Sequence, residues 1–368
     1  MKKLRAPYPW PGGKRKVADE VWRRFGDVQN HVEPFFGSGA TLLARPRPFG
    51  GVETINDKDG FVCNLWRALQ AAPGDVARHA DWPVNENDLH ARHVWLVGQR
   101  EPMTSKLEGD PEYFDAKIAG WWVWGLCCWL GTGWCAGRGP WVQHEGQLVH
   151  ADDIGVEYVT DSRNGSDQHG LGVSRKRMRL GRGAGGVNRQ MPDCSGMGGR
   201  GVHSAKNRSA AGVTVAGEQA RDRLVEWMRD LAERLRFVRV CCGDFERVLG
   251  TTPTTGNGLT AIFLDPPYSF ETGRDARCYA VDDATVSSRA RAWAIANGDN
   301  PKLRIALCGY EDEHEMPASW AKHRWSAHGG YGNQGGNTNG DRETIWFSPH
   351  CLADDRPMQL GLGLEVGR

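Results

Sequence analysis

The sequence lacks any apolar run of the ~18 residues that a membrane-spanning helix needs. Met1–Trp10 carries lysines but no apolar segment long enough for a secretory signal. We therefore expect a cytoplasmic chain without a membrane span. Its ten cysteines, in the absence of a secretory signal, are expected to be buried, reduced thiols.

Metal-ligand spacing is missing as well. No Cys-x-x-Cys pair occurs among the ten cysteines. Cys194 and His203 are possible ligands, but no second pair stands at the spacing of a zinc finger. The sequence thus predicts no metal site.

The sequence also lacks an excess of positive or negative charge. The chain carries 46 Lys and Arg against 45 Asp and Glu, a net charge of +1, so no global field draws it to nucleic acid. Any basic surface has to be local. Hydrophobic (39%) and charged (25%) residues occur in the shares of an ordinary folded protein, and 368 residues give room for one large domain or two. What the chain does have in excess is 48 glycines and 16 tryptophans, and both cluster.

One short segment combines a strand with a polar corner. Ala261–Leu264 is apolar throughout, which predicts a strand buried on both faces, and Asp265-Pro266-Pro267-Tyr268 follows it. The two prolines end the strand and keep the chain extended at the edge where open α/β sheets bind their ligands. Asp265 and the carbonyl of Pro266 are suited to accept both hydrogens of an amine on a flat ring, while Tyr268 stacks on that ring. The tetrapeptide alone fits a proline-stiffened turn equally well.

Such acceptors also change the reactivity of an amine. The exocyclic nitrogen of adenine is a poor nucleophile because its lone pair is delocalised into the ring. Hydrogen bonds from both of its N–H groups favour a tetrahedral nitrogen and return the lone pair for attack on an electrophilic methyl group. The corner is therefore able to activate an amine as well as to bind it.

Two glycine turns precede this corner. Pro9-Trp10-Pro11-Gly12-Gly13-Lys14 brings a glycine pair and a cation to the start of an expected helix, although a simple loop fits the same residues. His31–Glu33 is expected to be a strand, and residues 34–39 then turn into a helix, as in the βα loop of a doubly wound sheet. The third glycine of the dinucleotide fingerprint is missing. The turn therefore predicts close approach of a cofactor to the backbone without specifying a dinucleotide.

Acids follow two further strands. Val52–Asp57 is expected to be a strand that ends about 20 residues after the glycine turn, where Asp57 is suited to hold ribose hydroxyls. A helix cap or a solvated loop is the alternative. Phe237–Cys242 is another expected strand, and Asp244 and Phe245 follow it as candidates to bond and stack on an adenine. An acid at a strand–helix junction explains them as well.

The remaining pattern divides the chain. Helices are expected from residue 65 to near Pro73 and over 119–130, 218–236 and 287–296, and strands over 303–307 and 343–347. The tryptophans of 119–130 are expected in the core. Residues 75–215 depart from the α/β alternation. We therefore expect a catalytic domain made of 1–74 and 216–350, an inserted region at 75–215, and a frayed tail at 351–368.

Positive charge is concentrated in the inserted region. Between Arg163 and Arg208, ten Lys or Arg residues stand against two acids, a local balance of +8 that leaves about −7 for the rest of the chain. Eleven glycines in the same stretch leave it too little apolar surface for a core of its own. A solvated low-complexity insertion is one interpretation. We favour contact with nucleic-acid phosphates, through residues that include Arg138, Arg175, Lys176, Arg177 and Arg179.

Four motifs in a fixed order, at Trp10–Lys14, Glu33–Gly39, Asp57 and Asp265–Tyr268, resemble those of the Dam-type (D12 class, α-group) DNA adenine-N6 methyltransferases. The resemblance covers residues 5–70 and about 218–350. It implies a doubly wound, Rossmann-like class I methyltransferase sheet, S-adenosylmethionine as cofactor and double-stranded DNA as partner. The glycine- and arginine-rich insertion then lies in the target-recognition region, but it aligns with no counterpart in the family, so the target sequence stays open.

The resemblance also implies roles for individual residues. Trp10 and Lys14 are similar to the first cofactor motif, with Lys14 near the methionine carboxylate. Asp57 resembles the acid that holds the ribose. The other implied positions are the cofactor loop at Glu33, Pro34, Phe35 and Gly37, the contacts to the cofactor's adenine at Asp244 and Phe245, and the catalytic motif at Asp265, Pro266, Pro267 and Tyr268.

The sequence thus predicts a site-specific enzyme that methylates N6 of an adenine flipped out of DNA, in a restriction–modification or phage setting. Methylation of cytosine N4 poses the same geometric problem and is the nearest enzymatic alternative. A catalytically silent DNA-binding module with the same fold is the other, although the intact Asp265 and Tyr268 argue against it. The oligomeric state stays open.

Overall fold

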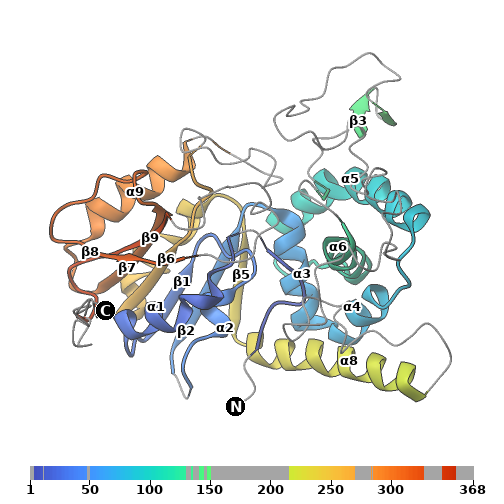
Figure 1. Cartoon of the computed structure of the whole chain (residues 1–368), viewed down its shortest axis with the longest axis horizontal. Coiled ribbons are helices and arrows are strands. Elements are labelled where there is room, and N and C mark those ends of the chain that lie inside the picture. Colours follow the sequence, from blue (N-terminus) through green and yellow to red (C-terminus); the bar gives the residue numbers. More distant parts are fainter. Residues whose placement is uncertain are drawn as a thin grey trace, which may run out of the picture.

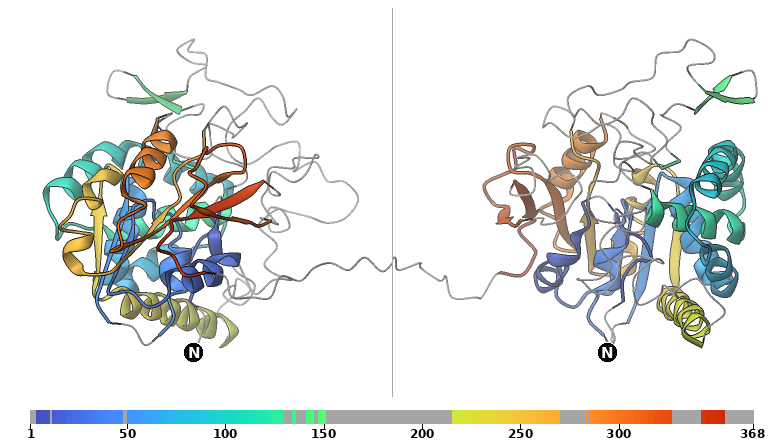
Figure 2. Two further views of the ribbon diagram at one scale, coloured as in Figure 1. Left: turned by 90° about the vertical axis from the view of Figure 1, so that its left-hand side faces the viewer. Right: turned by 45° about the vertical axis from the view of Figure 1, so that its right-hand side comes forward.

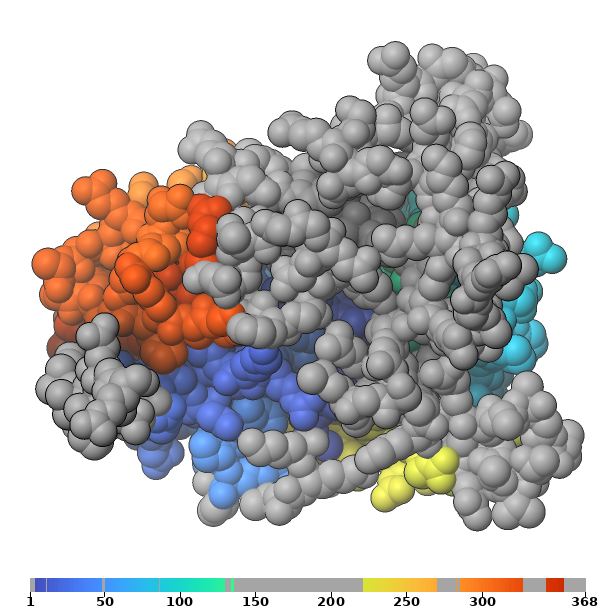
Figure 3. All heavy atoms as spheres, viewed as in Figure 1, coloured from blue at the N-terminus to red at the C-terminus, as the bar shows by residue number. Residues whose placement is uncertain are grey.

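The computed structural model describes residues 4–10, 12–47, 50–129, 134–135, 141–144, 147–150, 215–269, 283, 285–326 and 342–353. In Figure 1 these residues form a twisted sheet with covering helices and, beside it, a cluster of further helices. Figure 3 shows the same view with all atoms: the carboxyl-terminal strands lie at the left and the helical cluster at the right.

Seven of the nine described strands form one sheet in the order β5-β2-β1-β6-β7-β9-β8. From β5 to β7 neighbouring strands are parallel, whereas β9 is antiparallel to both β7 and β8. The strand order reverses between β1 and β6, which is the switch point where doubly wound sheets bind ligands. This confirms the predicted Rossmann-like class. The strands are β1 Asn30–Glu33, β2 Val52–Asp57, β5 Val238–Cys242, β6 Thr260–Leu264, β7 Leu303–Tyr310, β8 Ala321–Arg324 and β9 Glu343–Phe347.

Strand β6 runs through the centre of the molecule and is buried along its whole length, as its apolar sequence predicts. Its side chains alternate between two faces. Ala261 and Phe263 pack in a cluster with helix α1 (Ala18–Phe25). Ile262 and Leu264 pack in another with helix α9 (Val286–Asn297). Both faces of the central sheet are therefore covered, and ligands reach it only at its edges and strand ends.

The helical cluster lies at the β5 edge of the sheet, and the views of Figures 1 and 2 agree on this arrangement. It consists of α3 Gly60–Ala71, α4 Pro73–Ala80, α5 Glu86–Gly109, α6 Ala116–Cys128 and α8 Val215–Leu235. Trp122 and Trp124 of α6 are buried, which confirms the expected core position of these tryptophans. Helix α6 packs on α3 and α4, and α4 packs on α8, so segments from both sides of the expected boundaries at 74 and 215 share one hydrophobic core. The division into domains stays a prediction.

Further described elements are the 3-10 helices η1 Lys14–Lys16, η4 Phe245–Val248 and η5 Thr255–Asn257, the four-residue helix α2 Ala40–Leu43, and an antiparallel hairpin of β3 Trp141–His144 with β4 Gln147–His150. The candidate phosphate-binding residues Arg138, Arg175, Lys176, Arg177 and Arg179 lie outside the described residues, as does all of 163–208. Among the described helices, none is long and apolar enough to cross a membrane.

Candidate active site

The loops after β1, β2, β5 and β6 meet at one edge of the sheet, because parallel strands point their carboxyl ends in the same direction. Together with Trp10 and residues 12–14 they enclose a hollow of about 900 Å³, counting its opening to solvent, which we call the central pocket. Pro266 and Tyr268 belong to the corner beside it. The predicted site residues on its wall are Trp10, Lys14, Glu33, Pro34, Phe35, Gly37, Asp57, Asp244, Phe245, Asp265 and Pro267.

Asp57 joins two of these loops. Its Oδ2 accepts a hydrogen bond from the backbone N–H of Gly37 at 2.9 Å, and its Oδ1 accepts one from the N–H of Asp59 at 2.9 Å. Each oxygen keeps a further lone pair for a ligand. Burial raises the pKa of Asp57 to about 7, although backbone hydrogen bonds from Asp59, Gly37 and Lys58 oppose the shift. The carboxylate is therefore held on the pocket wall in a state that changes its charge near neutrality.

The glycines of the β1 loop serve the loop and its packing. Gly37 has φ of +47°, a left-handed conformation that side chains rarely adopt, and a Cβ there would lie 2.4 Å from Nε1 of Trp10. The hydroxyl of Tyr8 donates to the carbonyl of Gly37 at 2.6 Å, and Nε1 of Trp66 donates to the same carbonyl at 3.2 Å. Glycine is thus needed at position 37 to let Trp10 lie against the loop, a reason that the sequence motif did not contain.

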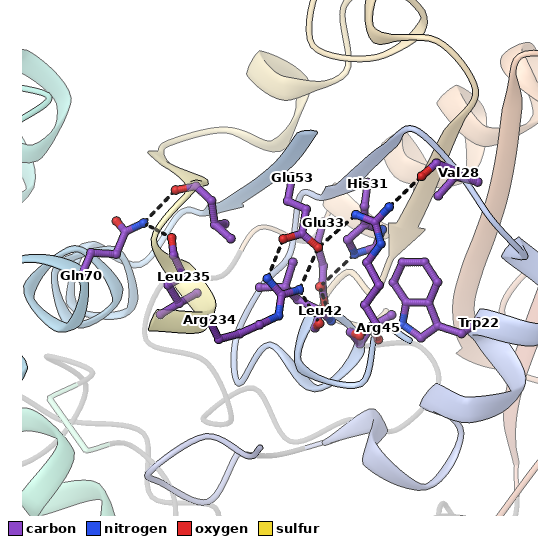
Figure 4. A network of polar contacts seen from close by, with 12 residues as sticks. Trp22, Val28, His31, Glu33, Leu42, Arg45, Glu53, Gln70, Arg234 and Leu235 are labelled. Carbon is purple, nitrogen blue, oxygen red and sulfur yellow. Dashed lines mark hydrogen bonds and ion pairs between the residues drawn. The ribbon is translucent and has the colours of Figure 1, made fainter. Parts of the chain in front are cut away.

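A network of buried charged residues holds the β1 loop in place (Figure 4). Glu53 of β2 accepts hydrogen bonds from Arg45 at 3.0 Å and from Arg234 of α8 at 2.6 and 2.7 Å. Arg234 also donates to the carbonyl of Leu42 in α2 at 2.8 Å, and Arg45 donates to the carbonyl of Val28 at 2.7 Å. The network therefore ties α2, the helix after the β1 loop, to strand β2 and to α8.

Glu33, at the end of β1, shares the interior with this network. It is 2% exposed, and its Oε2 accepts a hydrogen bond from the N–H of Leu42 at 3.2 Å. Burial raises the pKa of Glu33 well above its usual range. The side chain therefore braces the loop from within and also reaches the wall of the central pocket.

Aromatic rings and acids line the β5 side of the central pocket. Phe35 and Phe245 stack with ring centroids 5.0 Å apart, and the guanidinium of Arg289 lies 5.0 Å from the centroid of Phe245. Asp244 begins η4 by accepting from the N–H of Glu246, and it also pairs with Arg289 at 3.0 Å. The predicted pair Asp244 and Phe245 is therefore held by an arginine from α9.

Asp265 faces the opposite end of the central pocket and pairs with Lys14. The distance from Lys14 Nζ to Asp265 Oδ1 is 2.8 Å, and Lys14 Nζ also donates to the carbonyl of Gly12 at 2.8 Å. Burial raises the pKa of Asp265, and the ion pair with Lys14 opposes this shift. Burial alone would lower the pKa of Lys14, but Asp265 and Glu343 raise it above its usual range. Lys14 stays charged and lies at the catalytic corner as well as at the cofactor motif.

Tyr268 is largely buried behind this corner. Tyr268 is 7% exposed, and its hydroxyl donates a hydrogen bond to Oε2 of Glu343 at 2.7 Å. The ring meets that of Tyr310 edge-on, with centroids 4.7 Å apart. Asp265 lies on the wall of the central pocket and Tyr268 does not, so a base that stacks on Tyr268 would have to reach beyond this wall.

Several site residues were missed by sequence reasoning. Thr41 lines the central pocket, and its buried hydroxyl has no hydrogen-bond partner among the described residues. Lys58 and Asp59 directly follow the strand-end acid, a proximity that could have identified them. Arg289 lies within a helix and Glu343 starts an antiparallel strand, so neither follows a parallel strand, the position at which site residues were predicted. In the described part of the chain, no cluster of three His, Cys, Asp or Glu side chains is suited to hold a metal.

The sheet is Rossmann-like, and the central pocket lies at the strand ends where such sheets bind their ligands. Residues 10–91 match the family model of the D12 class N6 adenine-specific DNA methyltransferases. A comparison with curated proteins found no match. The family match supports an enzyme that methylates adenine at N6 in DNA, and it does not favour the cytosine alternative.

Proposed function

We propose that the chain binds S-adenosylmethionine in the central pocket and transfers its methyl group to an adenine flipped out of double-stranded DNA. The observation that carries the proposal is the position of Asp265, at the end of β6 and on the wall of the same pocket as Asp57 and Asp244. We also assign the chain to the Dam-type α-group, because the cofactor motifs precede the Asp-Pro-Pro-Tyr corner in the sequence.

The pocket residues fit this cofactor. Asp57 has lone pairs left for the ribose hydroxyls, and the stacked rings of Phe35 and Phe245 offer an apolar wall for the adenine. Asp244 is an acceptor for the adenine amine. The unpartnered hydroxyl of Thr41 is a further donor or acceptor for a bound polar ligand. The cofactor itself supplies an electrophilic methyl group on a sulfonium.

Lys14 links the two ligand positions in this scheme. Lys14 would hold the methionine carboxylate of the bound cofactor, and its ammonium is already 2.8 Å from Asp265. One cation thus serves the methionine end of the cofactor and the carboxylate that receives the target amine. This arrangement supports a short path between the methyl group and the amine.

Asp265 and the carbonyl of Pro266 accept the two hydrogens of the target amine and favour a tetrahedral nitrogen with its lone pair toward the cofactor. The prolines hold these two acceptors in fixed geometry, and Tyr268 supports the ring. Positioning of this kind lowers the barrier, because the entropy cost of bringing the reactants together is met when they bind. The proton that leaves the amine after transfer goes to Asp265 or to solvent.

Methylation-sensitive sequencing of DNA from cells that express the chain tests the proposal. We expect N6-methyladenine at a defined sequence, and its replacement by N4-methylcytosine would overturn the adenine assignment. Asp265→Ala should abolish the signal while binding of S-adenosylmethionine, measured by calorimetric titration, persists. Substantial turnover in Asp265→Ala would overturn the catalytic role of this carboxylate. DNA binding without any cofactor binding would point instead to a silent module.

A further inference from the structure

Glu343 is a buried carboxylate to which neither the motifs nor the family match assigns a role. It is the first residue of β9 and is 5% exposed. Its Oε2 accepts the hydroxyl hydrogen of Tyr268 at 2.7 Å and lies 3.9 Å from the ammonium of Lys14. A carboxylate at this depth is costly unless it is paired and hydrogen-bonded, and both of its described partners belong to the catalytic corner.

The sheet places Glu343 at this point through an antiparallel pair. Glu343 of β9 stands opposite Tyr310 of β7. Tyr310 packs edge-on against the ring of Tyr268, while Glu343 accepts from the hydroxyl at the end of that ring. One cross-strand pair therefore fixes both the side and the tip of Tyr268.

The charges of the corner are coupled in the same way. Asp265 and Glu343 share the single ammonium of Lys14, at 2.8 and 3.9 Å. Burial raises the pKa of Glu343, and Lys14 and the hydroxyl of Tyr268 counteract this shift. Because Lys14 lies between the two carboxylates, a change of charge at Glu343 alters how strongly Lys14 pairs with Asp265.

We propose that Glu343 is a positioning residue for methyl transfer: it holds the hydroxyl of Tyr268 and the ammonium of Lys14, and through them the ring and the carboxylate that receive the target amine. This inference rests on the proposed function. Glu343 itself touches neither cofactor nor base. Its contribution should therefore appear first in the rate of the bound complex, and it reaches the affinity for the cofactor only through Lys14.

The test compares Glu343→Gln and Tyr268→Phe, alone and combined, in single-turnover methyl transfer at saturating DNA and S-adenosylmethionine. The glutamine carbonyl still accepts from Tyr268, so this variant isolates the charge that acts on Lys14, whereas Tyr268→Phe isolates the hydroxyl. Each should slow transfer about 10- to 100-fold, the loss expected for one hydrogen bond or ion pair to a charged group. The cofactor Kd should be unchanged in Tyr268→Phe, and in Glu343→Gln it should change less than the rate does, because Glu343 acts on the cofactor only through Lys14. The double variant should be slower than the worse single variant by less than the product of the two losses.

The pH profile separates positioning from a structural role. Without the charge at Glu343, Lys14 pairs with Asp265 alone, which lowers the pKa of Asp265. The acid limb of the pH–rate profile should therefore move to lower pH in Glu343→Gln. A fold defect would lower the rate without moving this limb. Glu311→Gln is the matched control, because the carboxylate of Glu311 pairs with Lys322 at 3.0 Å and with Arg324, so its loss should leave the rate unchanged.

The possible results are distinguishable. A wild-type chain that methylates no adenine overturns the proposed function, and the inference falls with it. A wild-type chain that methylates while Glu343→Gln keeps its full rate overturns the inference alone. If Glu343→Gln fails to fold, Tyr268→Phe decides the question from the other side of the contact, and full activity of that variant overturns the inference.

Discussion

Residue identity and environment act together at Asp57. The role of Asp57 in holding a ribose was predicted from its place at a strand end, but its charge state depends on the fold. Burial brings its pKa to about 7, and backbone amides of two loops hold it in place. The same carboxylate therefore links pH to both cofactor binding and stability.

Asp57 should make cofactor binding pH-dependent. Ribose hydroxyls donate to the ionised carboxylate, so binding below pH 7 requires loss of a proton. The affinity for S-adenosylmethionine should therefore rise with pH and level off above about 7, as measured by titration calorimetry from pH 5.5 to 8.5. Asp57→Asn should bind more weakly and remove this rise, while DNA binding without cofactor stays unchanged. Equal losses in cofactor and DNA binding would mean that Asp57 supports the fold instead.

Asp57 should make the stability of the fold depend on pH in the opposite direction to cofactor affinity. Because folding raises the pKa of this acid, the folded chain holds the proton more tightly than the unfolded chain does. The stabilisation is fully present below the unfolded pKa and is lost as the pH rises through about 7. Cofactor-free protein should thus lose stability over the same range in which cofactor affinity grows. The same titration range in Asp57→Asn provides the control.

At the scale of elements, β2, α2 and α8 depend on the buried acid Glu53. Two arginines with side chains 2% exposed point at its carboxylate, at 3.0 and 2.6 Å. Removal of one member of such a network leaves the others buried without charge compensation. The loop that carries Gly37 begins and ends within this network, so its shape depends on Glu53.

Glu53→Gln should lower the free energy of unfolding by about 3–5 kcal/mol, the loss typical of a broken buried ion pair. Urea denaturation at pH 7 measures this change. Asp75→Asn is the control, because the ion pair of Asp75 with Arg78 is largely exposed and such pairs contribute about 0–1 kcal/mol. Similar losses in both variants would contradict the role of Glu53 as the centre of the network.

The sequence allowed prediction of those elements whose own residues determine their structure. The buried strands 261–264 and 303–307 follow from apolar runs, and the helix at 218–236 follows from its period, although it begins at Val215. Strand β8 was missed because its four residues, Ala321–Arg324, have no apolar alternation and pair only with β9. Helix α5 was missed because its 24 residues have little amphipathic pattern and include Pro102.

The same physical distinction applies to the site. Parallel strands bring their ends to one edge, so acids at strand ends could be combined from sequence into one pocket. Glu343 begins an antiparallel strand and Arg289 lies in the first turn of a helix, and they act on the site through Tyr268 and Asp244. Neither position follows from local pattern, because each depends on how distant segments pack.

For the whole molecule, the distribution of charge matters more than its sum. The net charge is +1, yet the stretch 163–208 holds a surplus of +8. These residues lie outside the described structure, so their role stays a prediction from sequence. DNA of any sequence presents phosphates, and a local basic surplus contributes affinity without specificity.

Arg175, Lys176, Arg177 and Arg179 provide the test at this scale. Changing all four to Gln should weaken DNA binding uniformly across sequences, and the slope of log affinity against log salt should become shallower by roughly 0.9 for each lost phosphate contact. Turnover at saturating DNA should persist, because none of the four belongs to the motifs of the central pocket. Arg78→Gln, which removes an exposed arginine already paired with Asp75, should leave the slope unchanged. An unaltered slope in the fourfold variant would assign the stretch to a solvated insertion, and a changed target sequence would mean that some of these side chains read base edges.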